Sequence, residues 1–254
     1  MNTKSSKATL SLEKALTIIE IMSDSPSSMR LLDIANSAGI PSSTALRLLN
    51  TLQIHGYVNQ DKLTSRYSLS LKLFHIGSKI ANNFSILNKA RPFLEILASR
   101  LKHSINFSVL QNENIFILDV VGGAYESPII TTQPGGSVPL YCTALGRAIM
   151  CHYTTEQIDV YLESHPLRAY TSLTITDRDM LIQELQLTRT RGYSYDRGEL
   201  RSGIAGVGTW ISDGSPFPAA SISVADLASS FTPELMHRWA HELQKTAHLI
   251  AQTI

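Results

Sequence analysis

The chain has 254 residues, of which 43% are hydrophobic and 17% charged, and its formal net charge at pH 7 is +1. This length suffices for one large or two ordinary domains, and so small a net charge points to neither nucleic acid nor a membrane surface. The two cysteines, Cys142 and Cys151, exclude a disulfide framework. Without a membrane-length apolar run or a signal-peptide core, the sequence predicts a cytoplasmic protein.

The first part of the chain shows helical periodicity interrupted by turn residues. The helices that we expect cover residues 11–23, 31–38 and 42–55. Ser11 is a candidate N-cap for the first helix, and Ser42 or Ser43 for the third. Gly39 and Gly56 are suited to end the second and third helices. Two helices joined by a glycine turn, after a longer first helix, predict a helix-turn-helix.

A short hairpin and a connecting helix are expected next. Residues 57–60 and 66–69 flank a turn at 61–65 and are typical of the wing of a winged helix-turn-helix. Residues 70–84 are expected to form a helix with its apolar side chains packed along it, namely Leu71, Leu73, Phe74, Ile76, Gly77 and Ile80.

The rest of the chain mixes strand and helix patterns, which predicts an α+β body. The expected helices cover 85–101, a segment starting near Thr143, 155–163, 177–191 and 232–253. The expected strands cover 105–111, 114–121, 127–133, 193–196, 203–212 and 219–224.

The first turn of the expected recognition helix carries the side chains suited to contact DNA. Hydroxyl groups suit phosphate or base edges, and arginine suits guanine or phosphate. On the wing, basic side chains would meet the phosphate backbone. The candidates are Ser42, Ser43, Thr44, Arg47, Lys62 and Arg66. The alternative is a small helical domain that docks on the body, with Arg47 as a solvated surface residue.

Several motifs occur in the order and spacing of a known family. "LLDIANSAGIPSSTALRLLNTL", "RYSLSLKLFHIG", "SVPLYCTALGRAIM" and "RTRGYSYDRGELRSGIAGVGTWISD" resemble the IclR (isocitrate lyase regulator) family of bacterial transcription factors. This resemblance implies a winged helix-turn-helix at 1–70, a linker helix at 71–84 and a GAF-like effector-binding domain at 85–254. It also implies a homodimer or homotetramer that binds a palindromic operator. Ser42 and Leu46 differ from residues common in the family's recognition helix.

The segment 139–150, "PLYCTALGRAIM", combines residues that suit more than one kind of site. If a helix starts near Thr143, the unpaired N–H groups of its first turn can bind an anion without a basic side chain. Gly146 would let another element pack closely. Cys142 could be a nucleophile, but a lone cysteine in apolar surroundings is usually a packing residue.

The resemblance also implies an effector pocket in the body. Ala144 and Leu145 would offer backbone N–H groups to a carboxylate, with the other pocket residues being Ile130, Val138, Asp196, Ile204, Gly206, Ser221 and Ser223. Hydroxyl and carboxylate groups on one strand face can bind a small polar metabolite. Alternatively, the two serines satisfy neighbouring strands and Asp196 caps a turn. Arg197 and Gly206 differ from residues common in the family.

Enzyme and metal chemistry have little support in the sequence. It contains no nucleophile elbow, phosphate loop, dinucleotide fingerprint or HExxH motif. His237, His241 and His248 share a face of the last helix, which exposed histidines explain as well as a metal site does. We therefore expect no enzyme activity, cofactor or metal.

The leading hypothesis is a DNA-binding transcriptional regulator. A small carboxylate, such as a sugar acid or 2-oxo acid, would bind the body and alter operator binding. The alternative is a metabolite-binding protein or small-molecule enzyme whose helical head serves assembly.

Overall fold

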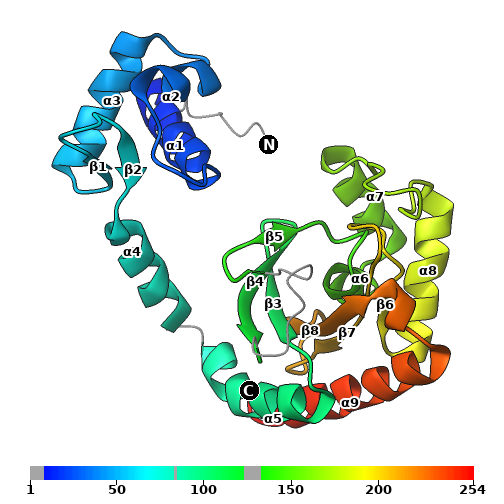
Figure 1. Ribbon diagram of the computed structural model, residues 1–254. Helices are drawn as coiled ribbons and strands as arrows, with labels where there is room; N and C mark the ends of the chain where they lie inside the picture. Colours follow the sequence, from blue (N-terminus) through cyan, green and yellow to red (C-terminus); the bar gives the residue numbers. More distant parts are fainter. Residues whose placement is uncertain (1–8, 83–84, 123–132) are drawn as a thin grey trace. The chain divides into compact units, whose positions relative to one another are not determined.

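The computed structural model describes residues 9–82, 85–122 and 133–254, with the side chains of Ala81 and Asn82 left aside. Contacts divide the chain into two compact units, Met1–Asn83 and Phe84–Ile254. Each unit is described by itself (Figure 1). The described residues contain nine α-helices and eight strands, an α+β architecture.

The first unit is a helix-turn-helix followed by a short hairpin. Its elements are α1 (Leu10–Ser23), α2 (Leu31–Ser37), α3 (Ser42–Ile54), β1 (Val58–Gln60), β2 (Tyr67–Leu69) and α4 (Leu71–Asn82). The antiparallel strands β1 and β2 pair Val58 with Leu69 and Gln60 with Tyr67. The expected head and wing are therefore both present.

The core of the first unit lies where the three helices meet the hairpin. Ile18 of α1, Ile34 of α2 and Leu49 of α3 are fully buried together, and Val58 and Tyr67 close this cluster from the hairpin. Each side chain comes from the apolar stripe of its own element, so the helical period of the sequence determines which face turns inward.

The glycine turns of the head are confirmed, whereas the expected N-caps are wrong. Gly39 and Gly56 have φ angles of +62° and +75°, the left-handed conformation that favours glycine at a helix end. Helix α1 begins one residue earlier than expected, with Thr9 in the N-cap position. Pro41 holds that position before α3, and neither residue makes a side-chain cap. Ser42 lies inside α3 because Pro41 supplies the extended residue that precedes a helix.

The expectation that the apolar side chains of α4 are packed is wrong within one copy of the chain. Leu71 and Phe74 are 83% and 74% exposed, and Ile76 and Ile80 are also exposed. The helix itself forms because its sequence has no proline and one glycine, Gly77. Its apolar surface therefore remains available to another molecule.

The second unit is built on a six-stranded antiparallel sheet in the order β5-β4-β3-β8-β7-β6. Its strands are β3 (Ile105–Gln111), β4 (Asn114–Val121), β5 (Ser137–Val138), β6 (Ser194–Asp196), β7 (Ile204–Ile211) and β8 (Ala220–Leu227). Its helices are α5 (Ser85–Leu101), α6 (Ala144–Met150), α7 (Thr155–Ser164), α8 (Arg178–Arg191), the 3₁₀ turn η2 (Ala228–Ser230) and α9 (Pro233–Ala251).

Helices cover both faces of this sheet, as expected for a GAF-like domain. Helices α5 and α9 lie along one face, and α6, α7 and α8 lie on the other (Figure 1). Phe107, Ile222 and Trp239 belong to the first apolar core, whereas Ile117 and Leu145 belong to the second. The sheet therefore separates two cores, each closed by its own helices.

Most of the elements expected in the body are present within a few residues of the expected bounds. Strand β5 was not expected, and the strand expected at 127–133 lies almost wholly outside the described residues. No helix in the described part of the chain is long and apolar enough to cross a membrane.

Candidate functional site

Helix α3 presents the candidate DNA-contacting residues on the side opposite its core face. Ala45, Leu48 and Leu49 are buried, whereas Ser43 and Arg47 are exposed. The hydroxyl of Thr51 donates to the carbonyl of Arg47 at 3.0 Å, but no described residue makes a hydrogen bond or ion pair with the Arg47 guanidinium. The guanidinium is therefore free to meet a base edge or a phosphate.

Ser42 and Thr44 lie beside these residues in the first turn of α3, and both are half-buried. Their hydroxyl groups make no capping bond to the helix. The first turn of α3 therefore carries three hydroxyl side chains close to Arg47, which are groups that can bond a phosphate oxygen.

The two basic residues of the wing differ in their freedom. Lys62 is exposed at the tip of the hairpin, where the Asp61 carboxylate fixes the turn by accepting the N–H of Thr64 at 2.6 Å. The guanidinium of Arg66 instead donates to the carbonyl of Ser28 at 2.8 Å and is half-buried. Arg66 therefore anchors the hairpin to the loop between α1 and α2, a role that the sequence pattern did not indicate.

A cavity of about 430 Å³ opens in the second unit on the α6 side of the sheet. This is the size of a typical small-molecule site. Seven of the expected effector residues line it, namely Val138, Ala144, Leu145, Asp196, Ile204, Gly206 and Ser223. Ile130 lies outside the described residues. Residues that the sequence did not single out also line it, among them Asn106, Leu200 and Arg201.

Thr143 caps the helix that begins at the cavity wall. Its hydroxyl accepts the N–H of Gly146 at 3.0 Å and donates to the carbonyl of Pro139 at 2.9 Å. No described residue accepts the backbone N–H of Ala144 or Leu145, as the geometry of a helix start dictates. Two unpaired donors therefore lie at the buried end of the cavity.

Glycines allow α6 to lie directly on its neighbours. A Cβ at Gly146 would collide with the backbone of Leu140, and one at Gly208 would lie 2.9 Å from the carbonyl oxygen of Ala144. The Ser194 hydroxyl donates to that same carbonyl at 2.5 Å. The start of α6 is thus held against β6 and β7 by close contact as well as by hydrogen bonding.

Asp196 ends β6 and both shapes a turn and lines the cavity. Its Oδ1 accepts the N–H groups of Gly198 at 2.9 Å and Glu199 at 2.8 Å. Burial raises the pKa of Asp196 to about 6, and the nearby Glu199 carboxylate adds to the rise. The backbone hydrogen bonds and Arg147 oppose it. Asp196 therefore changes its charge close to neutral pH.

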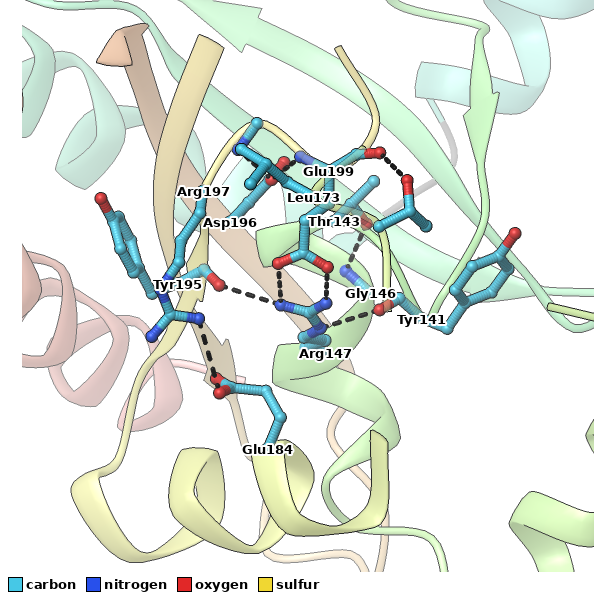
Figure 2. Close-up of polar contacts among 12 residues, drawn as sticks. Tyr141, Thr143, Gly146, Arg147, Leu173, Glu184, Tyr195, Asp196, Arg197 and Glu199 are labelled. Atoms are coloured by element: carbon cyan, nitrogen blue, oxygen red, sulfur yellow. Dashed lines mark hydrogen bonds and ion pairs between the residues drawn. The ribbon is translucent and has the colours of Figure 1, made fainter. Parts of the chain in front are cut away.

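A buried ion pair lies behind this turn. Arg147 of α6 and Glu199 form a two-pronged pair, with one Nη1 to Oε1 distance of 2.8 Å, and their side chains are 0% and 1% exposed. Arg147 also donates to the carbonyls of Tyr141 and Tyr195 at 2.7 and 3.0 Å (Figure 2). The pair ties α6 to the β6–β7 connection, and it joins residues too far apart in sequence for a pattern to reveal.

The two serines expected in the pocket have different surroundings. Ser223 lines the cavity, and its hydroxyl accepts the amide of Asn106 at 3.2 Å. Ser221 is fully buried away from the cavity, 2.7 Å from the hydroxyl of Ser108. The expectation that Ser221 contacts the effector is therefore not supported, because its partner strand already satisfies its hydroxyl.

The cysteine and two of the histidines considered for enzyme or metal chemistry are buried or contact neighbouring side chains. Cys142 is fully buried, and its burial raises the thiol pKa to about 12, so the thiol stays protonated. His237 contacts the hydroxyl of Tyr193, and His248 contacts Gln252. Within the described ranges, no three His, Cys, Asp or Glu side chains are placed to hold a metal ion.

The family model described as "Bacterial transcriptional regulator IclR C-terminal" matches residues 78–252, and the IclR helix-turn-helix domain matches residues 11–62. The chain belongs to the IclR family of bacterial transcriptional regulators. It is 29% identical over 243 residues to the transcriptional repressor IclR of Escherichia coli, covering 93% of this chain and 87% of that one.

Solved structures agree with this assignment. The Thermotoga maritima IclR structure is 28% identical, with a TM-score of 0.78 over 95% of this chain and 97% of that chain. An IclR homologue from Microbacterium hydrocarbonoxydans, solved with 4-hydroxybenzoate, shares the fold at 19% identity, with a TM-score of 0.79 over 95% of this chain and 98% of that one. This IclR-family chain is thus a transcriptional regulator with a DNA-binding head and an effector domain, and the named relatives are regulators rather than enzymes.

Proposed function

We propose that this IclR-family regulator binds a small carboxylate in the cavity of its second unit and that binding alters its affinity for operator DNA. The observation that carries the proposal is the cavity of about 430 Å³, with two unpaired N–H groups and the Asp196 carboxylate at its wall. Residues 1–70 would form the DNA-binding domain, 71–84 the linker helix and 85–254 the effector domain.

The wall of the cavity favours a hydroxylated carboxylate, such as a sugar acid, over an apolar ligand. The N–H groups of Ala144 and Leu145 can donate to a carboxylate, whereas Asp196 and Ser223 can bond hydroxyl groups. Val138 and Ile204 supply apolar contacts at the sides. The 4-hydroxybenzoate bound by the Microbacterium hydrocarbonoxydans homologue is also a carboxylate.

A homodimer that binds a palindromic operator accounts for the exposed apolar side chains of α4. A second copy would cover Leu71, Phe74 and Ile80, which water otherwise surrounds. Two heads related by twofold symmetry then read two half-sites of opposite direction. Two dimers would form a tetramer, and because its target is chromosomal DNA the protein acts in the cytoplasm.

Operator binding by α3 is tested with the DNA upstream of the protein's own gene. We expect a mobility shift that survives competition by unrelated DNA, and Arg47→Ala should weaken it by about 1–3 kcal/mol if Arg47 reads a base. Leu46→Ala, on the same exposed side of α3 but without charge, serves as the control. A shift that unrelated DNA abolishes would contradict the proposal.

Effector binding is tested separately by thermal shift with a panel of sugar acids and 2-oxo acids. A ligand that binds only the folded protein raises the unfolding temperature. At one hundred times its Kd it adds about 2.7 kcal/mol to the free energy of unfolding. The active compound should then change the mobility shift. If no acid in the panel stabilises the protein at millimolar concentration, the carboxylate class is wrong.

A further inference from the structure

The connection between β6 and β7, residues 197–203, brings a second charged side chain to the cavity. Arg201 lines the wall, and Asp196 is the other charged residue among the described residues that do so. Arg201 is exposed, whereas Ala144 and Leu145 are 6% and 5% exposed. Arg201 therefore lies at the mouth of the cavity and the start of α6 at its buried end.

The connection that carries Arg201 is held from several sides. The hydroxyls of Thr171 and Thr174 donate to the carbonyls of Gly198 and Glu199 at 2.8 and 2.6 Å. The carboxylate of Glu199 is fixed by the buried pair with α6 (Figure 2). The backbone at the cavity mouth is therefore set before any ligand binds, which lowers the entropy lost on binding.

The guanidinium of Arg201 has no partner in the described part of the chain. Arg197, four residues earlier, is engaged elsewhere, because it contacts the Glu184 carboxylate at 3.6 Å and stacks on the ring of Tyr195. Figure 2 shows Arg197 turned toward Glu184. Of the two arginines in this connection, Arg201 alone faces the cavity with its hydrogen-bonding groups unused.

We propose that Arg201 is a specificity-determining residue that binds a second carboxylate, so that the effector is a hydroxylated dicarboxylate. This inference rests on the proposed function, which places one carboxylate at the buried end. A planar guanidinium binds carboxylate through two parallel hydrogen bonds. Asp196 and Ser223 also line the cavity and can bond the hydroxyl groups of such a ligand.

The test compares galactarate and galactonate, which differ only in having a carboxylate or a hydroxymethyl group at one end. Isothermal titration calorimetry of the full chain should show that galactarate binds at least about tenfold more tightly than galactonate. Arg201→Ala should weaken the binding of galactarate and so bring the ratio of the two affinities close to one. Arg197→Ala, which removes a cation of the same segment that does not line the cavity, should keep the full ratio.

The outcomes separate this inference from the function on which it rests. Equal binding of both acids by the unaltered protein, or an unchanged ratio in Arg201→Ala, would overturn the role of Arg201 and leave a carboxylate effector in place. Absence of heat with both acids would overturn the sugar-acid class and this inference together. A thermal melt of each variant checks that any loss of affinity does not come from unfolding of the protein.

Discussion

Arg147 and Glu199 place two opposite charges in the interior of the second unit. Their mutual contact and the carbonyls of Tyr141 and Tyr195 satisfy most of the donors of the guanidinium. Such a pair adds little net stability, because both ions lose their hydration. Loss of one partner is different, since it leaves an uncompensated buried charge.

Arg147→Ala should therefore lower the free energy of unfolding of the second unit by about 3–5 kcal/mol. Urea unfolding followed by tryptophan fluorescence measures this unit alone, because both tryptophans, Trp210 and Trp239, belong to it. Arg178→Ala is the matched control. It breaks exposed pairs with Asp159 and Asp179, and such solvent-exposed pairs contribute little to stability. Similar losses in both variants would contradict a special role for the buried pair.

Asp196 should give the stability of the second unit a pH dependence of defined sign. Its pKa is raised to about 6, so between the ordinary value of 3.8 and 6 the folded state binds more protons than the unfolded state. The contribution of Asp196 to stability is therefore fully present below about pH 4 and is lost as the pH rises through 6.

Asp196→Asn should remove this decline, because the amide does not ionise. The difference in unfolding free energy between variant and parent should shift in favour of the variant by up to about 3 kcal/mol from pH 4 to pH 7. Urea titrations at both pH values measure it. A difference that stays constant with pH would show that Asp196 ionises normally.

At the level of elements, the contact between α6 and β7 positions the start of α6, which forms part of the cavity wall. Gly208→Ala should push the start of α6 away, because the new methyl group would lie 2.9 Å from the carbonyl oxygen of Ala144. We expect a loss of about 1–3 kcal/mol in unfolding free energy, together with weaker effector binding.

Gly206→Ala is the control for this change. Gly206 lies two residues earlier on β7 and lines the cavity, and its added methyl would lie 3.3 Å from the carbonyl oxygen of Val224, a tight contact that a small shift relieves. This variant should keep most of the stability of the parent protein. It should bind the effector more weakly only because the methyl group fills part of the cavity. If both variants lose the same free energy of unfolding, the close packing of α6 does not explain the need for glycine at position 208.

Local patterns in the sequence were enough to predict most elements, because their causes are local. Gly39 ends a helix through its own backbone freedom, and Thr143 starts one through a bond three residues away. The N-caps failed at Ser11 and Ser42 because several neighbouring residues could begin the helix. Which serine lines the cavity was not predictable, because it depends on Ser108 of a strand more than a hundred residues distant.

For the whole molecule, the exposed apolar side chains of α4 bear on both folding and assembly. Phe74 and Leu71 are exposed although the helical period aligns them for packing. In the proposed dimer, a second copy would cover this apolar surface, which a single chain leaves exposed. The proposed dimer would account for the failure of the expected packing within one copy.

Phe74→Glu should shift the protein toward the monomer, because the charge would have to be buried in the proposed interface. Sedimentation velocity at micromolar concentration measures the shift, and operator affinity should fall with it. Ile96→Glu, which changes an exposed apolar residue of α5, is the control. An unchanged sedimentation coefficient in Phe74→Glu would place the interface elsewhere.

The pairing of β3 with β8 sets an order of events during synthesis. Asn106 and Ser223 bond across these neighbouring strands although they are 117 residues apart. At about 5–20 residues per second, a ribosome needs on the order of 10 s to supply the second strand after the first. The head is complete before then. A nascent or prematurely terminated chain can thus carry a finished DNA-binding head without the sheet on which effector control depends.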